Sequence, residues 1–245
     1  AVTSAAVKPK IAVTTGTVVT DVTLPKPISA TYVYTATGGV LATLTVNSGT
    51  GDIAHTARAG TAAAGKAGNL YKVQHVEVGV AADGQACSYT AATKTILVSA
   101  DAATGAQTAQ TGAALCNNDA AYSALFVASV AAPGVMNAHA NVAAAALAGG
   151  LDLLTTTVTM SEEMEKAAAA QFTISGITCT EAIKTVAATN NGNLTGVIAI
   201  TCTTNGTIVA GVNTVTVAAD AATVDRAGNL VDQTGTNESV AMYAG

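Results

Sequence analysis

Residues 70–80 read LYKVQHVEVGV, a stretch in which apolar and polar side chains alternate, and this alternation indicates the fold class. Successive side chains of a strand point to opposite faces, so a period of two favours a half-buried β-strand. Short apolar stretches between Gly- and Asn-containing turns recur at 31–35, 40–46, 86–90, 95–100, 123–130, 154–160, 172–174, 182–186, 197–202, 213–218 and 240–243. Strands this short and this regularly spaced predict an all-β chain of antiparallel β-sandwiches.

Four local patterns add detail to this prediction. Ala-Thr-Gly-Gly at 36–39 predicts a hairpin between the first two strands, and the polar, Gly/Ala-rich residues 47–69 predict a loop. Ser161, followed by two glutamates, predicts a capped short helical turn over 161–171. Residues 134–150 combine the Ala content of a helix with flanking glycines, and helix, strand and loop stay open there.

Residues 1–24 predict a strand-like arm ahead of the compact body. One face of this arm carries, at a period of two, Val18, Thr20, Val22 and Leu24. Pro25 and Pro27 then interrupt the strand pattern. We therefore expect three parts: the N-terminal arm at 1–24, a first β-sandwich domain at 25–150 and a second one at 151–245.

The four cysteines predict disulfides, because they contain no C-x-x-C spacing and have no neighbouring His that would indicate zinc. Of the three possible pairings we favour Cys87–Cys116 and Cys179–Cys202, since each pair then lies within one predicted domain. Disulfides indicate an oxidising compartment, whereas four buried free thiols would suit a cytosolic protein. The first residues, AVTSAAVKPK, resemble a mature N-terminus left after signal-peptide removal, which favours a secreted protein at the cell surface.

The composition is that of an apolar, weakly charged chain. Of its 245 residues 10% are charged and 3% aromatic, with no Trp, and the mean hydropathy is +0.44. The longest uncharged stretch, 120–151, is a poor membrane span because it is mostly Ala and Gly. Disordered chains are highly charged, which this one is not. We therefore expect a β protein whose neutral surface is covered by copies of itself. The net charge of −5 and the scattered basic residues argue against nucleic acid as a partner.

The second half of the chain resembles the bacterial Ig-like domains of S-layer proteins and surface adhesins. The resemblance rests on residues 158–176 (VTMSEEMEKAAAAQFTISG) and 211–230 (GVNTVTVAADAATVDRAGNL), and it covers about 151–245. The matching positions are Ser161, Met164, Phe172, Gly211, Thr214, Val215, Val217, Asp225, Ala227, Gly228 and Asn229. The resemblance implies a passive structural module. It places Met164 and Phe172 in the core, and it gives Gly228 and Asn229 positive φ in a turn that Asp225 closes.

Side chains with catalytic chemistry are few and scattered. His55, His75 and His139 have no metal-ligand spacing and are expected to be isolated polar side chains. Glu162, Glu163 and Glu165 are typical of a solvated face rather than of an acid pair. Asp220, Asp225 and Asn229 could ligate Ca²⁺, although turn hydrogen bonding explains them as well. We expect no enzyme activity, no cofactor and no metal, while sequons at Asn193, Asn205 and Asn237 allow glycans.

These observations favour a structural subunit that assembles with its own copies into an extracellular filament or surface layer, through donation of the N-terminal strand. The alternative is a surface adhesin or carbohydrate-binding module, which would need an exposed aromatic platform or a metal loop. A secreted hydrolase with an unrecognised site is a third hypothesis.

Overall fold

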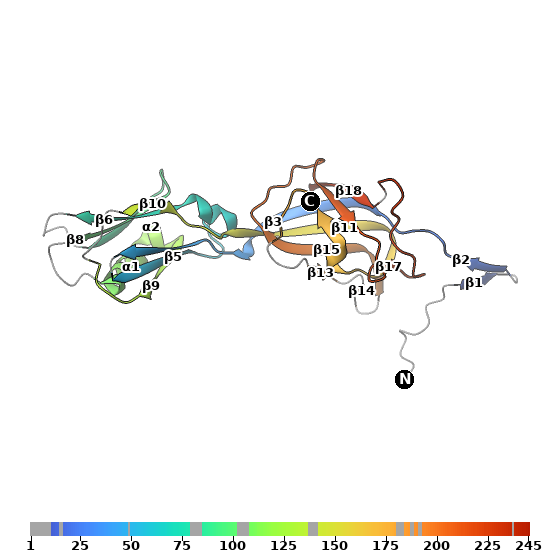
Figure 1. Ribbon diagram of the computed structural model, residues 1–245, viewed down its shortest axis with the longest axis horizontal. Coiled ribbons are helices and arrows are strands. Elements are labelled where there is room, and N and C mark those ends of the chain that lie inside the picture. Colours follow the sequence, from blue (N-terminus) through green and yellow to red (C-terminus); the bar gives the residue numbers. More distant parts are fainter. Residues whose placement is uncertain are drawn as a thin grey trace, which may run out of the picture. The chain divides into compact units, whose positions relative to one another are not determined.

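The computed structural model describes residues 11–14, 17–48, 50–78, 85–101, 108–136, 142–179, 184–186, 189–190, 193–236 and 238–245. The chain is mostly β, with 53% of residues in strands and 13% in helices, and it has the sheets of an all-β sandwich protein, as predicted. It divides into two compact units (Figure 1): unit 1 comprises Ala1–Tyr34 and Leu154–Gly245, and unit 2 comprises Thr35–Leu153.

Unit 2 is an insertion into unit 1. The chain enters it along β3 (Pro27–Val40) and leaves it along β11 (Leu151–Lys166), and both strands cross the division between the units. The predicted domains at 25–150 and 151–245 are consecutive, whereas residues 25–34 belong with 154–245. A strand contributed from a distant part of the chain leaves no local pattern, so the sequence could not place it.

Unit 1 is built on a sheet in the order β12-β16-β18-β3-β11-β15-β13, with β14 pairing to β15 and β17 to β11. Besides β3 and β11 its strands are β12 (Phe172–Ile174), β13 (Lys184–Val186), β14 (Thr189–Asn190), β15 (Asn193–Thr204), β16 (Thr214–Val217), β17 (Val224–Asp225) and β18 (Ser239–Ala244). β18 pairs with β3 in parallel, which departs from the antiparallel prediction. A separate two-stranded sheet consists of β1 (Ile11–Thr14) and β2 (Thr17–Thr20).

The core of unit 1 follows the alternation of β11. Alternate residues of this strand are buried from Asp152 to Met160, and Leu154, Val158 and Met160 enter the core. Met164 and Phe172 are 0% and 1% exposed there, as predicted. The predicted helical turn at 161–171 is wrong: β11 continues to Lys166, and a 3-10 turn at Ala169–Gln171 follows it. Pairing along β11 therefore outweighs the local capping signal of Ser161.

Unit 2 contains two sheets, one in the order β4-β5-β9 and one in the order β10-β6-β8-β7. The strands of the first are β4 (Thr43–Ser48), β5 (Gly51–Ala57) and β9 (Phe126–Ala132). Those of the second are β6 (Lys72–Val78), β7 (Ala86–Thr90), β8 (Thr95–Asp101) and β10 (Val142–Ala146). β6 and β8 pair in parallel. Buried residues of both sheets, including Ile53, Val73 and Ile96, form one core.

Two predictions for the start of unit 2 are wrong. The Ala-Thr-Gly-Gly segment does not turn: β3 runs through it, and β4 pairs with β5. β5 itself lies in the predicted loop at 47–69. Gly39 serves close strand packing instead, because a Cβ there would lie 2.1 Å from the Leu151 carbonyl oxygen.

The helix α1 (Ala109–Asn118) was not predicted, because its Ala/Gly-rich sequence resembles the loops of this chain. The Thr108 side chain caps it by accepting from the Thr111 N–H. A short second helix, α2 (Ala120–Ser123), follows, and the Asp119 carboxylate caps it by accepting from the Tyr122 N–H at 2.7 Å.

The disulfides join the cysteines in the pairing that the sequence favours. Cys87–Cys116 ties β7 to α1 in unit 2, and Cys179–Cys202 fixes a loop to β15 in unit 1. Each bond closes a loop within its own unit, so each constrains the unfolded state of that unit. Among the helices of the described residues, none is both long enough and apolar enough to cross a membrane.

Candidate assembly site

The predicted N-terminal arm is a hairpin followed by an extended segment. β1 and β2 pair antiparallel, with Ile11 opposite Thr20 and Thr14 opposite Thr17. Val18 and Thr20 lie in β2, but the strand ends there. Val22 and Leu24 lie beyond it in backbone without regular structure, and their side chains are 75% and 44% exposed. The single strand predicted from Val18 to Leu24 is therefore wrong beyond Thr20.

The segment 21–26 is held on unit 1 by backbone hydrogen bonds. The Asn229 side-chain amide donates to the carbonyl oxygens of Asp21 (3.3 Å) and Thr23 (2.9 Å). The Pro25 carbonyl oxygen accepts from the Asp232 N–H at 2.9 Å. Lys26 bonds Ser161 twice, its N–H donating to the Ser161 Oγ and its carbonyl oxygen accepting from the Ser161 N–H. The attachment to the body of unit 1 thus begins at Asp21, immediately after the hairpin.

Three carboxylates meet where this segment docks. One oxygen each of Asp21, Glu162 and Asp225 lies within 4.8 Å of the others. Burial raises the pKa of Glu162, and the charges of Asp21 and Asp225 raise it further. The Oε1 atom of Glu162 is buried without a hydrogen-bond partner. Oxygen atoms in this arrangement are the kind of ligand that a hard cation such as Ca²⁺ takes.

The turn that the family resemblance singled out supplies one of these carboxylates. Asp225 accepts from the Asn229 N–H at 2.7 Å and from its side-chain amide at 2.8 Å. Gly228 has a φ of 87°, as expected, whereas Asn229 is not among the residues with positive φ. The Asp220 side chain accepts from the Ala222 N–H in its own turn. The structure therefore joins Asp225 to Asn229, and adds Asp21 and Glu162, which sequence spacing could not indicate.

In unit 2, β9 has an open edge, because in the described part of the chain it pairs only with β5. Side chains cover part of that edge. The Arg58 Nε donates to the Phe126 carbonyl oxygen at 2.8 Å, and the Asn117 amide bonds both the N–H and the carbonyl oxygen of Ala128. By the alternation of a strand, the N–H and carbonyl of Val130 face the same open side. No described strand pairs with this end of the edge.

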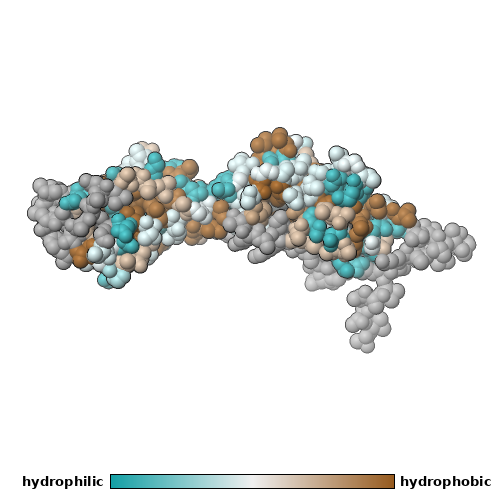
Figure 2. Space-filling view, in the orientation of Figure 1, coloured by the Kyte–Doolittle hydropathy of each residue, from teal (hydrophilic) through white to brown (hydrophobic). Residues whose placement is uncertain are grey.

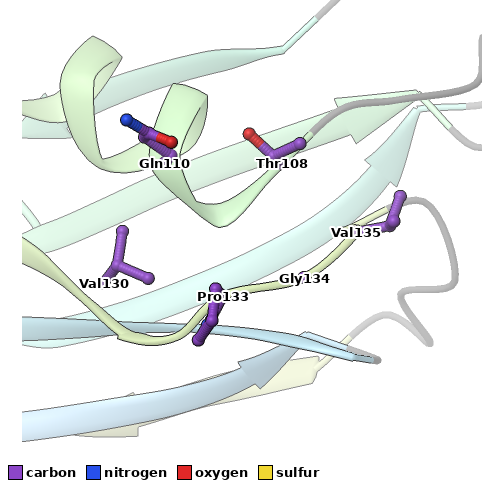
Figure 3. A pocket seen from close by; sticks show the side chains of 6 residues that line it. All are labelled: Thr108, Gln110, Val130, Pro133, Gly134 and Val135. Carbon is purple, nitrogen blue, oxygen red and sulfur yellow. The ribbon is translucent and has the colours of Figure 1, made fainter.

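A pocket of about 500 Å³ lies beside that end of β9. In Figure 3, Thr108 and Gln110 at the start of α1 face the segment that runs from Val130 to Val135. Pro133 and Gly134 complete the lining, and Val130 and Val135 are each 39% exposed. These lining residues include no acid, base or thiol. The pocket thus offers apolar contact to a side chain rather than catalytic chemistry.

The surface of unit 1 also exposes large apolar side chains, visible as brown patches in Figure 2. Val212 is 71% exposed, and Val209 and Tyr243 are each 57% exposed. A Cβ added at Gly211 would lie 3.6 Å from the Tyr243 ring, so this turn and β18 are neighbours. The expectation of an apolar surface therefore agrees with the exposure of these residues.

Two of the three histidines are not isolated, in contrast to the prediction. His55 and His75 are not isolated: both are 0% exposed, and their Nε2 atoms lie 3.3 Å apart. His139 lies outside the described residues. Strands β5 and β6 bring the pair together across 20 residues, and no motif spacing signals that contact.

In comparisons with known proteins, no family model, no curated protein and no solved structure matches the chain. The resemblance of residues 151–245 to bacterial Ig-like domains therefore stays a prediction.

Proposed function

We propose that this chain is a structural subunit that assembles with copies of itself into an extracellular filament or surface layer. The observation that carries the proposal is the pairing of β1 and β2, a sheet of two four-residue strands that no other described strand extends. A two-stranded hairpin is marginally stable in water, and three or more strands are needed for independent stability. A sheet edge on a second copy supplies the missing partner.

The edge of β9 is the acceptor that suits a donated strand best. The outward-facing backbone groups of Val130 offer hydrogen bonds, and the adjoining pocket receives an apolar side chain at the same place. The arm supplies the matching sequence, because Val and Thr dominate residues 11–20. A strand of one copy on the body of the next is a head-to-tail contact, which produces filaments when the rotation does not close.

Two further observations support an extracellular structural role. The two disulfides favour an oxidising compartment, and the exposed Val209, Val212 and Tyr243 offer additional contact area to neighbouring copies. A carbohydrate-binding role is less well supported, because Tyr243 is the one aromatic side chain of the chain that is mostly exposed. We further propose that the chain has no catalytic activity.

Electron microscopy of the full chain and of a variant lacking residues 1–20 tests the proposal. The truncation ends before Asp21, so the hydrogen bonds that hold 21–26 on unit 1 are kept. We expect filaments or sheets from the full chain and single particles from the truncated one. Polymers formed equally well by both proteins would exclude the arm as the joint.

A matched control separates strand pairing from mere arm length. Val13→Pro and Val18→Pro, one in each strand of the hairpin, remove backbone donors without shortening the chain. We expect the double variant to behave like the truncated protein. Normal assembly by this variant would show that the arm acts by some means other than strand pairing.

A further inference from the structure

Two buried histidines connect the two sheets of unit 2. His55 lies on β5 and His75 on β6, and both side chains are fully buried. Their Nε2 atoms are 3.3 Å apart, and the other ring nitrogen of His55 lies 3.0 Å from the hydroxyl of Tyr122, also 0% exposed. The three rings form a continuous polar path inside an otherwise apolar core.

The geometry of this pair limits how many protons it can hold. Two neutral imidazoles share one proton between the facing nitrogens, and either tautomer of His55 satisfies Tyr122. A first added proton places an ionic charge in the core, which is costly without a buried counter-ion. A second one would place two N–H donors face to face across 3.3 Å. In the unfolded chain both rings are free to take up protons near pH 6.5.

Burial opposes a positive charge on His55. Burial is the one cause that lowers the pKa of His55, to about 4, and the charge that acts on Tyr122 is the positive one of Arg58. Among the described residues, the other charged side chains on the elements around the pair are Asp52 on β5, Lys72 and the exposed Glu77 on β6, and Asp119 before α2, while β8 ends at Asp101. The Asp119 carboxylate caps α2.

We propose that His55 and His75 form an acid-sensitive latch between the sheets of unit 2, so that proton uptake opens this unit while unit 1 stays folded. A His whose pKa is lower in the folded state than in the unfolded state contributes stability that is lost as the pH falls below 6.5. Acid therefore destabilises unit 2. The sequence of unit 1 contains no His, because His55, His75 and His139 all lie within 35–153. Unit 1 therefore serves as the internal reference for the effect of histidine protonation on the unfolding of unit 2.

Hydrogen exchange of the full-length protein, followed by mass spectrometry after correction for intrinsic exchange, tests the latch. From His55 alone we expect the unfolding equilibrium constant of unit 2 to rise about 20-fold between pH 7 and pH 5. Peptides of β5 and β6 should report it, and peptides of β11 and β15 should not. An equal or smaller rise in unit 2 than in unit 1 would overturn the proposal.

Two variants assign the effect to the pair. His55→Gln keeps a hydrogen-bonding side chain but cannot titrate, and it should reduce the rise at least several-fold, whereas His139→Gln should leave it unchanged. If His55→Gln does not fold, ring-nitrogen NMR of the wild-type protein decides. The latch requires a neutral His55 ring in the folded protein at pH 5.5, and a protonated one contradicts it.

Discussion

The side chain of Asn229 shows how much of unit 1 depends on one residue. Its amide bonds the backbone at Asp21 and Thr23 and the carboxylate of Asp225, so it joins the N-terminal segment to the turn after β17. Position 225–229 was predicted as a turn, and its internal bonds were expected. The bond to a segment about two hundred residues away was not, because sequence distance carries no information about it.

The polar clusters likewise depend on contacts between distant residues, which the sequence does not predict. Burial of Met164 and Phe172 could be predicted, because large apolar side chains are mostly buried in folded proteins. The approach of Glu162 to Asp21 and Asp225, and of His55 to His75, depends on which strands become neighbours. Residue types alone do not contain that information.

We expect Glu162→Gln to stabilise unit 1 at pH 7. Burial, followed by the charges of Asp21 and Asp225, raises the pKa of Glu162, so the folded state binds its proton more tightly than the unfolded state. This group therefore costs stability as the pH rises through its raised pKa. Removing the charge should increase the free energy of unfolding by about 0.5–1 kcal/mol.

Urea unfolding in EDTA, which removes divalent cations from the carboxylates, measures this effect. Glu163→Gln is the matched control, because Glu163 is exposed on the same strand and is not part of the cluster. A loss of stability in Glu162→Gln, or an equal gain in both variants, would contradict an electrostatic repulsion of Glu162 by Asp21 and Asp225.

At the scale of elements, strands were easier to predict than their partners. β12 coincides with the predicted 172–174, and β7 with 86–90. Alternation and β-branched residues identify a strand locally. The hairpin at 36–39 failed because β3 continues through these residues beside β11, and the contacts of a long strand outweigh the turn preference of two glycines. Helix α1 was missed because its Ala-rich sequence lies among loops of the same composition.

Asn117 protects the open edge of β9, and its replacement should expose that edge. Asn117→Ala removes two hydrogen bonds to Ala128, so we expect a loss of about 1–2 kcal/mol in the stability of unit 2. The freed edge should also increase irregular aggregation. Asn118→Ala is the control, since Asn118 is the next residue of α1 and is also exposed. Chemical denaturation and light scattering measure the two effects, and identical results for both variants would contradict this role.

Removal of the Cys87–Cys116 bond should destabilise unit 2 selectively. With Cys87→Ser and Cys116→Ala, the chain-entropy model gives a loss of about 3.5 kcal/mol for a loop of this length. Differential scanning calorimetry should show one transition at lower temperature and the other unchanged. A parallel shift of both transitions would mean that the units do not unfold independently.

The whole molecule is a domain inserted into another domain, and its fragments test this architecture. Residues 154–245 alone lack β3, which lies between β18 and β11 and contributes the buried Ala30. We expect this fragment not to fold. Residues 21–34 joined to 154–245 by a short linker should fold cooperatively, as followed by circular dichroism. Cooperative unfolding of 154–245 by itself would contradict the division.

For the whole molecule, we expect copies of the chain to assemble through the N-terminal strands, and sedimentation velocity of the full chain tests this assembly. Over a concentration series, we expect large species that dissociate to monomers when an excess of a peptide of residues 11–24 is added, because the peptide occupies the acceptor edge. A single monomeric boundary at every concentration, or polymers that the peptide leaves intact, would contradict assembly through these strands.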